Sequence, residues 1–497
     1  MGVEQHVDHL VVGAGFAGLC TAIKLDEAGE RDFLVVERAH DVGGTWRDNT
    51  YPGAACDVPS QLYSFSFARN PDWTRSFSPQ PEIHAYLQRV ARDAEVLDRF
   101  RFATDVLDAR WDDDRQRWVT RTSTGTVVSR TLISGAGALV EPRLPDIDGI
   151  GSFQGEVFHS ARWDHDADLT GKRVAVIGTG ASAIQIVPEL AGATRHLDVY
   201  QRTAPWVLPR HERAYSSVER RLFRRFPLLQ KLYRSGIYWG RETWVAGFTV
   251  EPRLFAPVER LARRHIAREI RDPELRARVT PDFRMGCKRI LQSNSYYPAL
   301  DRDDVDLVTD PIVKVTGDAV VTADGTERPV DVIVVATGFH TTDPPIARHV
   351  TGRDGRTLAD TWAGSGMAAY RGTTVHGFPN YFSIVGPNTG LGHSSMVFVI
   401  ESQVAYIRDA LRTMRAHGWA EVEPRAEAQR AWNAALQRRM GRTVWQTGGC
   451  ASWYLDEHGR STTLWPRTTV TMRRRLSRFD AGAYEVAPAR EVARVGG

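Results

Sequence analysis

The spacing of apolar residues in the first third of the chain predicts a doubly wound unit of parallel strands and helices. A short apolar strand over 9–12 runs into a glycine-rich turn, and helical periodicity follows over 16–28. A second apolar strand over 33–37 ends on an acid, and a two-stranded ribbon is expected within 106–122. A returning apolar strand ends over 134–139 in small residues. This order of elements is typical of a dinucleotide-binding sheet.

The same pattern restarts in the middle of the chain. Apolar strands are expected over 172–178, 197–202 and 330–338, with an arginine-rich helical stretch between the last two. We therefore expect an α/β fold of two Rossmann-like, doubly wound, dinucleotide-binding domains with a helical insertion in the second. The expected division of the chain is 1–150 and 372–497 for the first domain, 151–209 and 284–371 for the second, and 210–283 for the helical insertion.

The turn after the first strand has the sequence of a pyrophosphate-binding loop. Gly13 permits the tight turn, Gly15 lets the backbone approach a phosphate, and Gly18 lets the helix pack closely on the strand. The start of the following helix supplies free N–H groups and the positive end of its dipole. Glu37, at the end of the second strand, stands where a carboxylate binds the ribose hydroxyls of a dinucleotide.

The second unit repeats this loop with one informative change. Gly178, Gly180 and Ala183 take the places of the three glycines, but Arg202 stands where the first unit has its acid. An acid there would repel a 2′-phosphate, whereas an arginine can bind it through two parallel hydrogen bonds. The second loop is therefore expected to bind NADPH rather than NADH, with an ordinary surface arginine as the alternative interpretation.

Composition narrows the class of protein. The 497 residues are 42% hydrophobic and 25% charged, with a net charge of +4 that gives no reason to expect nucleic acid. The basic charges of the helical stretch are interpreted as a solvated helix face rather than a membrane surface. No apolar run has the length of a membrane-spanning helix and no signal peptide precedes the first strand, so a cytoplasmic protein is expected.

The cysteines carry no local motif. Their spacing is not that of a zinc site or of a redox pair, so no metal is expected, and few scattered cysteines fit a reducing interior. They are Cys20, Cys56, Cys287 and Cys450.

Two further motifs carry a resemblance to a known family. The segment between the two glycine loops contains the spaced residues Phe153, Gly155, His159, Trp163 and Asp164. An earlier segment contains Gly43, Gly44, Trp46, Tyr51, Pro52, Gly53 and Asp57. Together with both glycine loops, these motifs are similar to those of the class B flavoprotein monooxygenases, and among them the Baeyer–Villiger monooxygenases. The resemblance extends over nearly the whole chain.

The resemblance implies FAD on the first loop and NADPH on the second. Beyond the first loop and Glu37, the residues implied to line FAD are Thr45, Trp46, Asp57, Tyr63, Val106 and Met396. Beyond the second loop and Arg202, the residues implied to contact NADPH are Ser182, Thr203, Lys288, Arg289 and Trp453. Lys288 is implied to help bind the 2′-phosphate, and Arg289 is implied to be the catalytic arginine.

A cation at the reaction centre has a physical reason. An anionic flavin peroxide needs a positive partner and exclusion of water, or it decays to hydrogen peroxide. Arg289 stays charged at any working pH, and Asp57 is expected to hold its planar fork in place; a purely structural salt bridge is the alternative. His159 is expected to fix the orientation of the two domains rather than to act as a base, and Trp163 to anchor packing. The sequence leaves open whether His393 contacts substrate or caps a helix.

We therefore predict a Baeyer–Villiger monooxygenase that acts through a peroxide at flavin C4a and converts a ketone or aldehyde to an ester or lactone, with sulfoxidation as a side activity. An N- or S-oxygenating flavin monooxygenase is the alternative, and the Trp163-Asp164 ending of the linker favours ketone chemistry. A flavin disulfide reductase and a non-catalytic NADPH-binding module are weaker alternatives. The expected partners are the carbonyl substrate and O2, without nucleic acid or membrane, and the chain is a monomer or homodimer.

Overall fold

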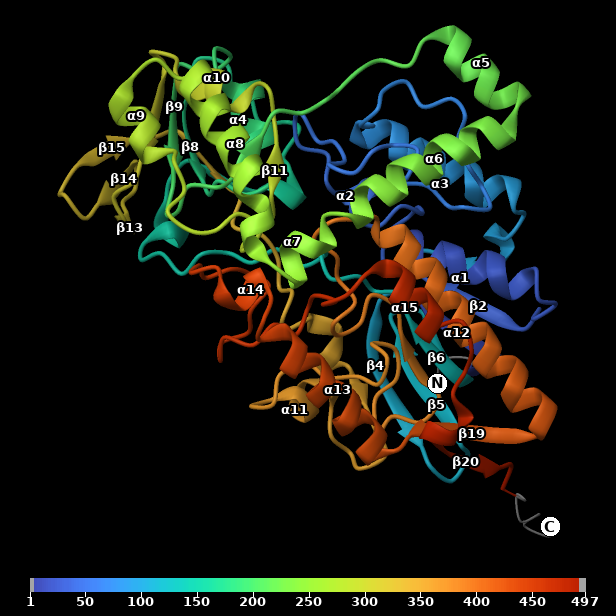
Figure 1. Ribbon diagram of the computed structural model, residues 1–497. Helices are drawn as coiled ribbons and strands as arrows, with labels where there is room; N and C mark the ends of the chain where they lie inside the picture. The colour runs from blue at the N-terminus through green and yellow to red at the C-terminus, as the bar shows by residue number, and fades with distance from the viewer. Residues whose placement is uncertain (1–3, 491–497) are drawn as a thin grey trace.

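The computed structural model describes residues 4–490, which form two sheets with helices around them (Figure 1). The strands of the first sheet are β1 (Glu4–Val12), β2 (Phe33–Val36), β3 (Phe100–Arg101), β4 (Val106–Asp112), β5 (Arg117–Thr122), β6 (Gly125–Ser134), β17 (Val350–Thr351) and β18 (Tyr381–Ser383). They lie in the order β17-β4-β5-β6-β1-β2-β3, with β18 paired to β6. The central strand β1 pairs in parallel with β2 and β6, and β4, β5 and β6 form the antiparallel ribbon that the sequence predicts.

Helices cover this first sheet. They are α1 (Phe16–Asp26), α2 (Thr45–Asp48), α3 (Gln80–Asp93) and α12 (Met396–His417). Every residue of α1 from Phe16 to Ile23 is buried, because α12 packs on α1 and closes the side that would otherwise face water. The glycine loop that precedes α1 is thus held between a buried strand and a buried helix.

The second sheet is parallel throughout. Its strands are β7 (Glu156–His159), β8 (Arg173–Ile177), β9 (His196–Tyr200), β12 (Val305–Val308) and β16 (Val332–Val335), in the order β12-β9-β8-β16-β7. The helices α4 (Ala183–Leu190) and α10 (Tyr296–Leu300) pack beside it, and an antiparallel ribbon follows, made of β13 (Ile312–Val315), β14 (Ala319–Thr322) and β15 (Glu327–Pro329). The expected α/β fold with two Rossmann-like sheets is confirmed, and the strands differ from their predicted ranges only at the ends.

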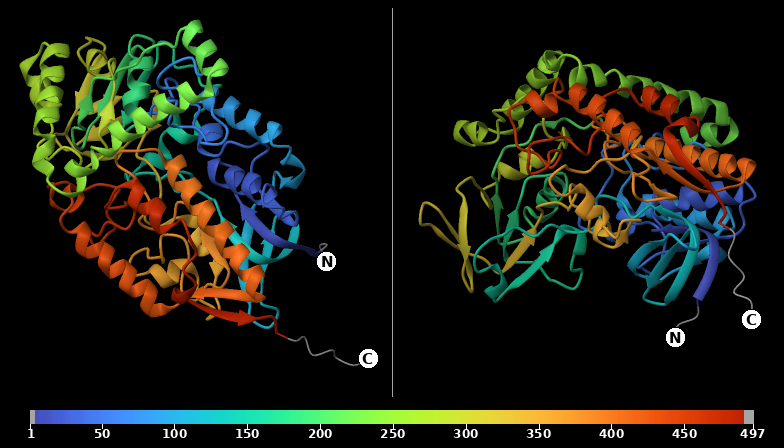
Figure 2. Two further views of the ribbon diagram at one scale, coloured as in Figure 1. Left: turned by 45° about the vertical axis from the view of Figure 1, so that its right-hand side comes forward. Right: turned by 90° about the horizontal axis from the view of Figure 1, so that it is seen from below.

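The helical stretch divides between the two sheets. Its helices are α5 (Ser217–Arg225), α6 (Pro227–Glu242), α7 (Val245–Thr249), α8 (Ala256–Glu269) and α9 (Pro273–Arg278). α8 packs against α10 and against β10 (Val207–Leu208), next to the second sheet. α5 and α6 instead lie across the first sheet's side of the molecule, at its outer surface (Figures 1 and 2). Gln230 of α6 donates hydrogen bonds to Gln61 and to the Asn70 carbonyl, at 2.8 and 2.7 Å.

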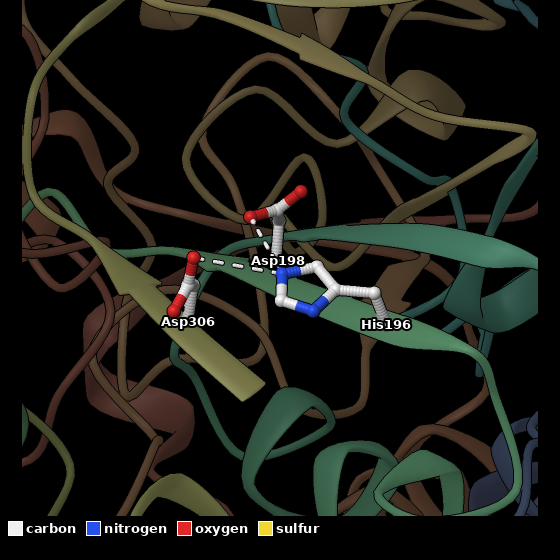
Figure 3. Close-up of side chains that lie close together, drawn as sticks. All are labelled: His196, Asp198 and Asp306. Carbon is white, nitrogen blue, oxygen red and sulfur yellow. Dashed lines mark ion pairs between the residues drawn. The ribbon is translucent and has the colours of Figure 1, made fainter. Parts of the chain in front are cut away.

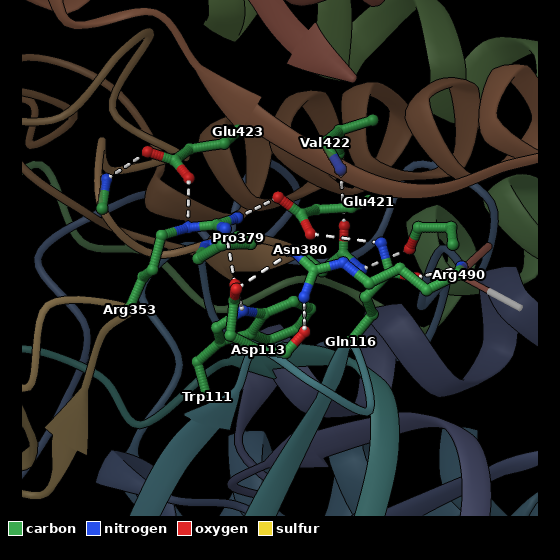
Figure 4. Close-up of polar contacts among 12 residues, drawn as sticks. Trp111, Asp113, Gln116, Arg353, Pro379, Asn380, Glu421, Val422, Glu423 and Arg490 are labelled. Atoms are coloured by element: carbon green, nitrogen blue, oxygen red, sulfur yellow. Dashed lines mark hydrogen bonds and ion pairs between the residues drawn. The ribbon is translucent and has the colours of Figure 1, made fainter. Parts of the chain in front are cut away.

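The last part of the chain returns to the first sheet. It contains α11 (Leu358–Trp362), α13 (Ala426–Met440), β19 (Trp419–Pro424), α14 (Val444–Thr447), α15 (Thr469–Arg475) and β20 (Tyr484–Pro488). β19 and β20 pair with each other, and a charged network joins them to the tip of the β4–β5 ribbon (Figure 4). In it Arg353 pairs with Asp113, Glu421 and Glu423, and Arg490 pairs with Asp113. The network anchors both ends of the β19–β20 pair.

One cluster of possible metal-ligating groups lies on the second sheet, in His196, Asp198 and Asp306 (Figure 3). The guanidinium of Arg328 lies 3.3 Å from Asp198 and 3.2 Å from Asp306. An arginine therefore already supplies positive charge to both carboxylates. Over residues 4–490, no helix is both long and apolar enough to cross a membrane.

Candidate active site

The first glycine loop has the geometry that its sequence predicts. Gly13 has φ +94°, in the region that favours glycine, and a Cβ on Gly18 would lie 1.7 Å from the Gly13 carbonyl oxygen. α1 begins at Phe16 with no side-chain cap and no acid in its first turn. Its first N–H groups and the positive end of its dipole are therefore available to an anion, as a pyrophosphate requires.

Glu37 is buried beside this loop. Its carboxylate accepts hydrogen bonds from the N–H groups of Ala14, at 2.7 Å, and Ala39, at 3.0 Å. Arg47 lies 3.1 Å from the same carboxylate and offsets its charge. The acid thus shapes the loop through the Ala14 contact as well as standing at the strand end where ribose binding is expected.

The second loop has a similar geometry. Gly178 has φ +117°, and a Cβ there would lie 2.6 Å from the Ala336 carbonyl oxygen of the neighbouring strand end. Ser182 is the N-cap of α4, which has no acid in its first turn and no side-chain cap. A Cβ added at Gly180 would meet no atom within 4 Å, so the backbone there is open to a ligand. Thr203 lies next to the loop, since its carbonyl accepts from the Thr179 hydroxyl at 3.2 Å.

Two cations from distant parts of the sequence meet near this loop. Burial lowers the pKa of Lys288, and the charge of Arg202 lowers it further. Arg202 itself is exposed. Two like charges that act on each other favour a nearby anion, and a 2′-phosphate carries the charge that would relieve their repulsion.

The segment from Gly43 to Asp57 connects the two loops. At its start, a Cβ on Gly44 would lie 3.0 Å from the Gly15 Cα, so two glycines pass each other at close range. Near its end, Gly53 has φ +77° and lies against the backbone of Gln185 on α4, where a Cβ would stand 2.6 Å from the carbonyl oxygen. The segment therefore sets the distance between the two nucleotide loops.

Side-chain hydrogen bonds also hold this segment against α4. Gln185 donates to the Ala55 carbonyl at 3.0 Å and accepts from the Tyr51 hydroxyl at 3.0 Å. Tyr51 belongs to the early motif, and Gln185 comes directly after the second loop. These two hydrogen bonds attach the early motif to α4, the helix that follows the second glycine loop.

Asp57 ends this segment and holds Arg289 with both oxygens. The guanidinium Nε lies 2.9 Å from Oδ2, and Nη2 lies 2.7 Å from each oxygen. Arg289 is placed by β11 (Leu291–Gln292), which follows it and pairs in parallel with β10. Both side chains keep about a quarter of their surface exposed, 24% for Arg289 and 29% for Asp57, so the pair can be reached by a small molecule.

Charge and burial oppose each other in this pair. Burial acts to raise the pKa of Asp57, but the charge and hydrogen bonds of Arg289 outweigh it and the pKa is lowered. Burial acts to lower the pKa of Arg289, but the charge and hydrogen bonds of Asp57, with the neighbouring Tyr454, together outweigh it and raise the pKa. The ion pair is therefore charged at all physiological pH values.

Three neighbours of this pair were not found from the sequence. Arg241, at the end of α6, donates to the Asp57 carbonyl at 2.9 Å, and Arg289 donates to the Leu391 carbonyl at 3.3 Å. Tyr454 is buried close to Arg289; burial raises its pKa to about 12, although Arg289 acts to lower it. Arg241 lies in a helical stretch whose partner in space no local pattern reveals.

His393 forms a buried pair with an acid of α6. Its Nε2 lies 3.0 Å from Glu242 Oε1, and the side chains are 3% and 6% exposed. Glu242 also accepts from the N–H and the hydroxyl of Thr469, at 3.1 and 2.5 Å. The helix that follows is capped by Ser395, whose hydroxyl accepts from the Val397 N–H at 3.2 Å. His393 is therefore not the helix cap; it fastens its loop to α6.

The aromatic residues expected at the flavin form a cluster. The Trp46 indole N–H donates to the Tyr63 hydroxyl at 3.0 Å, and their rings meet edge to face at 5.5 Å. Thr45 begins α2, immediately before Trp46. Two further expected flavin residues stand at the starts of other elements: Val106 begins β4, and Met396 is the first residue of α12.

The linker motif is fixed by its backbone. His159 ends β7, which pairs in parallel with β16, and its Nδ1 accepts from the Ala161 N–H at 3.1 Å. Burial lowers the pKa of His159 to about 4, so it is neutral at pH 7. Trp163 packs edge to face on Phe158 at 5.0 Å, as expected of an anchor. The side-chain hydrogen bond of His159 is local, so β pairing holds this segment on the second sheet.

Two other motif residues have clear places. A Cβ on Gly155 would lie 2.2 Å from the Asp331 carbonyl oxygen and 2.6 Å from the Phe153 ring, so this position requires glycine. Asp164 is exposed and accepts from the Asp166 N–H at 2.9 Å. These contacts shape the linker. Asp164 takes no part in the hydrogen bonds of the Arg289–Asp57 pair.

A disulfide joins the arginine segment to the C-terminal segment. Cys287, next to Lys288, pairs with Cys450 across a sequence separation of 163 residues. Local spacing gives no sign of this pair, and its presence departs from the expectation of reduced, scattered cysteines. Trp453 follows shortly after; its side chain is 47% exposed and its ring lies 4.3 Å from that of Tyr454.

Comparison with known proteins identifies relatives along the full length. A family model described as flavin-binding monooxygenase-like matches residues 7–238. A Baeyer-Villiger monooxygenase of Streptomyces coelicolor is 53% identical and covers 97% of this chain and 93% of its own length. A Baeyer-Villiger monooxygenase of Pseudomonas aeruginosa is 50% identical and covers 97% of this chain and 92% of its own length.

Solved structures agree with these relatives. A complex of OTEMO with FAD and NADP has a TM-score of 0.86 at 30% identity, over 97% of this chain and 99% of that one. An oxidized steroid monooxygenase bound to NADP has a TM-score of 0.85 at 31% identity, over 97% and 100%. A closed form of cyclohexanone monooxygenase has a TM-score of 0.87 at 28% identity, over 98% and 100%.

Proposed function

The chain belongs to the Baeyer–Villiger monooxygenase family of flavin-binding monooxygenases, and on this premise we propose that Arg289 and Asp57 form its reaction centre. The activity of the family is the insertion of one oxygen atom of O2 beside a ketone or aldehyde carbonyl, with FAD and NADPH as cofactors. FAD, when bound and reduced by NADPH, supplies the oxygen activation. The N- or S-oxygenating alternative is not favoured by the relatives.

One observation carries the assignment of residues. The segment that ends in Asp57 touches the first loop at Gly15 and the second at Gln185, and Asp57 itself holds Arg289. The arginine is thus fixed at the junction of the two nucleotide sites. A fixed cation there stabilises negative charge that develops on the reacting oxygen, and it needs no reorganisation when the charge appears.

The remaining residues bind and orient. We assign the first loop, Trp46 and Tyr63 to FAD, and Arg202 and Lys288 to the 2′-phosphate of NADPH. The Leu391 carbonyl and Tyr454 both lie beside Arg289 and support a reaction centre that is enclosed by protein. Groups placed around the cation exclude water, which limits the loss of activated oxygen as hydrogen peroxide.

The Arg289→Ala variant tests this assignment, with Arg284→Ala as a matched control because Arg284 is exposed on the same segment. Arg289→Ala should still bind FAD and be reduced by NADPH, but ester formation should fall by about 10²–10³-fold. NADPH consumption should then yield hydrogen peroxide. If ester formation in Arg289→Ala equals that of the control, the assignment is wrong.

The division of the chain and its setting are part of the same proposal. We propose that 1–150 and 372–497 bind FAD, that 151–209 and 284–371 bind NADPH, and that 210–283 is inserted in the second domain. We propose that the enzyme acts in the cytoplasm as a monomer or homodimer. Limited proteolysis of the holoenzyme, with and without NADP⁺, tests the division, because NADP⁺ should protect the second unit.

A further inference from the structure

An apolar surface lies on the two outer helices of the insertion, far in the sequence from any cofactor motif. Large side chains of α5 and α6 face solvent there, and Figures 1 and 2 show both helices at the outer edge of the molecule. We call this the α5–α6 surface; its members, with their exposed fractions, are Leu222 (39%), Phe226 (54%), Leu228 (66%), Leu229 (43%), Leu232 (61%) and Trp239 (59%). Scattered exposed leucines are ordinary, but a contiguous group of this size on neighbouring helices marks an interaction site.

The α6 helix carries large apolar side chains on its outward face as well as on the face that packs on the protein. Its inner face mixes apolar and polar contacts, since Tyr233 and Ile237 pack against the core beneath the first sheet's helices. Three residues of that face make hydrogen bonds: Gln230 bonds Gln61, Arg234 donates to Ser64 at 3.1 Å, and Tyr238 bonds the Thr469 hydroxyl at 2.8 Å. These residues recur every four positions, so they share one face. Leu228, Leu232 and Trp239 occupy the opposite face. A helix in water normally keeps its outward face polar, so the outward apolar stripe of α6 points to a partner.

Positive charge surrounds the stripe. Between 217 and 240 Glu219 is the only acid, and it is held by Arg213 at 2.7 Å. The exposed basic residues of the same stretch are Arg221, Arg224, Arg225 and Lys231, and of these Arg224 pairs with Asp72. α15 lies beside α6 and adds Arg473, which sits 5.6 Å above the Phe398 ring that stacks on Tyr238.

We propose that the α5–α6 surface docks on an anionic lipid bilayer, with its leucines and tryptophan in the headgroup boundary and its arginines on acidic headgroups. A basic helix with leucine and tryptophan on its other exposed face has the composition of an interfacial helix. A second copy of the chain fits less well, because a two-fold contact would place one cationic face against an identical cationic face. The sequence alone predicts a solvated helix face, and the exposed apolar side chains change that interpretation.

Vesicle co-sedimentation of the FAD-loaded enzyme tests the proposal at physiological ionic strength. The vesicles are phosphatidylcholine alone, or phosphatidylcholine mixed with an equal amount of phosphatidylglycerol. One variant combines Leu228→Ser with Leu232→Ser, and another combines Arg221→Glu with Lys231→Glu. None of these positions belongs to the cofactor or reaction site, so flavin absorbance and ketone turnover should stay unchanged and report correct folding.

Matched controls carry the same chemical changes elsewhere. A double variant, Leu144→Ser with Val313→Ser, removes two aliphatic side chains that are 64% and 54% exposed on other parts of the surface. Arg195→Glu with Arg348→Glu reverses two exposed charges outside the insertion. Both controls should bind vesicles as the unaltered enzyme does.

The enzyme should sediment with the anionic vesicles far more than with the neutral ones. Each surface variant should lose at least about tenfold in binding, since basic side chains and buried apolar area each contribute to attachment. Equal binding to both vesicle types, no binding at all, or an equal loss in the controls would overturn the proposal. So would a concentration-dependent dimer that the Leu228→Ser and Leu232→Ser changes split, because the surface would then be an interface between copies.

Discussion

Replacement of Glu242 by leucine should be one of the most destabilising single changes near the reaction centre. The carboxylate accepts three hydrogen bonds: one from His393, one from the Thr469 N–H and one from the Thr469 hydroxyl. It is 6% exposed, and its histidine partner is 3% exposed. Burial acts to raise the pKa of Glu242, but the hydrogen bonds from His393 and Thr469 and the charge of His393 together outweigh it and the pKa is lowered. The group is therefore a buried anion whose partners depend on it.

The magnitude follows from the partners left behind. Each buried donor without an acceptor costs about 1–3 kcal/mol, and water cannot enter readily to replace the carboxylate. Loss of one member of a buried charged pair costs about 3–5 kcal/mol in other proteins. We expect Glu242→Leu to lower the free energy of unfolding by about 3–5 kcal/mol. Thr469→Val removes the hydroxyl's hydrogen bonds to Glu242 and Tyr238 but keeps the carboxylate, and it should lower the free energy of unfolding by about 1–2 kcal/mol.

The change should also reach catalysis through the loop. His393 is two residues from Leu391, whose carbonyl accepts from Arg289. A loosened loop should let water reach the centre, so the ratio of hydrogen peroxide to ester should rise while flavin reduction by NADPH stays near normal. The test combines urea unfolding followed by flavin fluorescence with an assay of both products.

A double-mutant cycle with His393→Leu makes the test specific. If Glu242 and His393 act as a pair, the double variant should lose at least about 1 kcal/mol less than the sum of the two single losses. Additive losses, or a loss below about 1 kcal/mol for Glu242→Leu, would refute the reasoning.

Three further predictions concern other parts of the site. Arg202→Gln should lower the preference for NADPH over NADH, measured as the ratio of kcat/KM values, by about tenfold or more, because a bidentate contact to the 2′-phosphate is lost. An unchanged ratio would mean that Arg202 is an ordinary surface arginine without a role in binding NADPH. Oxidised enzyme should show two fewer free thiols than its sequence provides, and four free thiols under non-reducing conditions would contradict the pairing. Replacing Cys287 and Cys450 by serine should lower the free energy of unfolding by up to about 5 kcal/mol, since the disulfide closes a long loop. The folded pKa of His159, about 4, lies below its unfolded value of 6.5, so the stabilisation that His159 contributes is complete above pH 6.5 and is lost as pH falls toward 4, by up to about 3 kcal/mol. His159→Gln should therefore flatten the plot of unfolding free energy against pH between these values. An unchanged slope in the variant would show that His159 is not the cause.

The sequence determined the features that depend on short spacing. Gly13 and Gly178 are set by local backbone geometry, and both have the positive φ angles that their loops predict. The apolar strands reveal themselves because both faces of a parallel sheet are buried, so the runs are continuous. The pairing of Arg289 with Asp57 could also be anticipated, but only because each lies in a family motif.

Only the tertiary structure decided the contacts that join distant segments. Glu242 meets His393 across 151 residues, and Cys287 meets Cys450 across 163. No local periodicity encodes such meetings, because they depend on how segments far apart in the sequence fold onto one another. The fold also left leucines of α6 facing outward, which a helical pattern cannot predict, since the pattern does not say which face of a helix meets the protein.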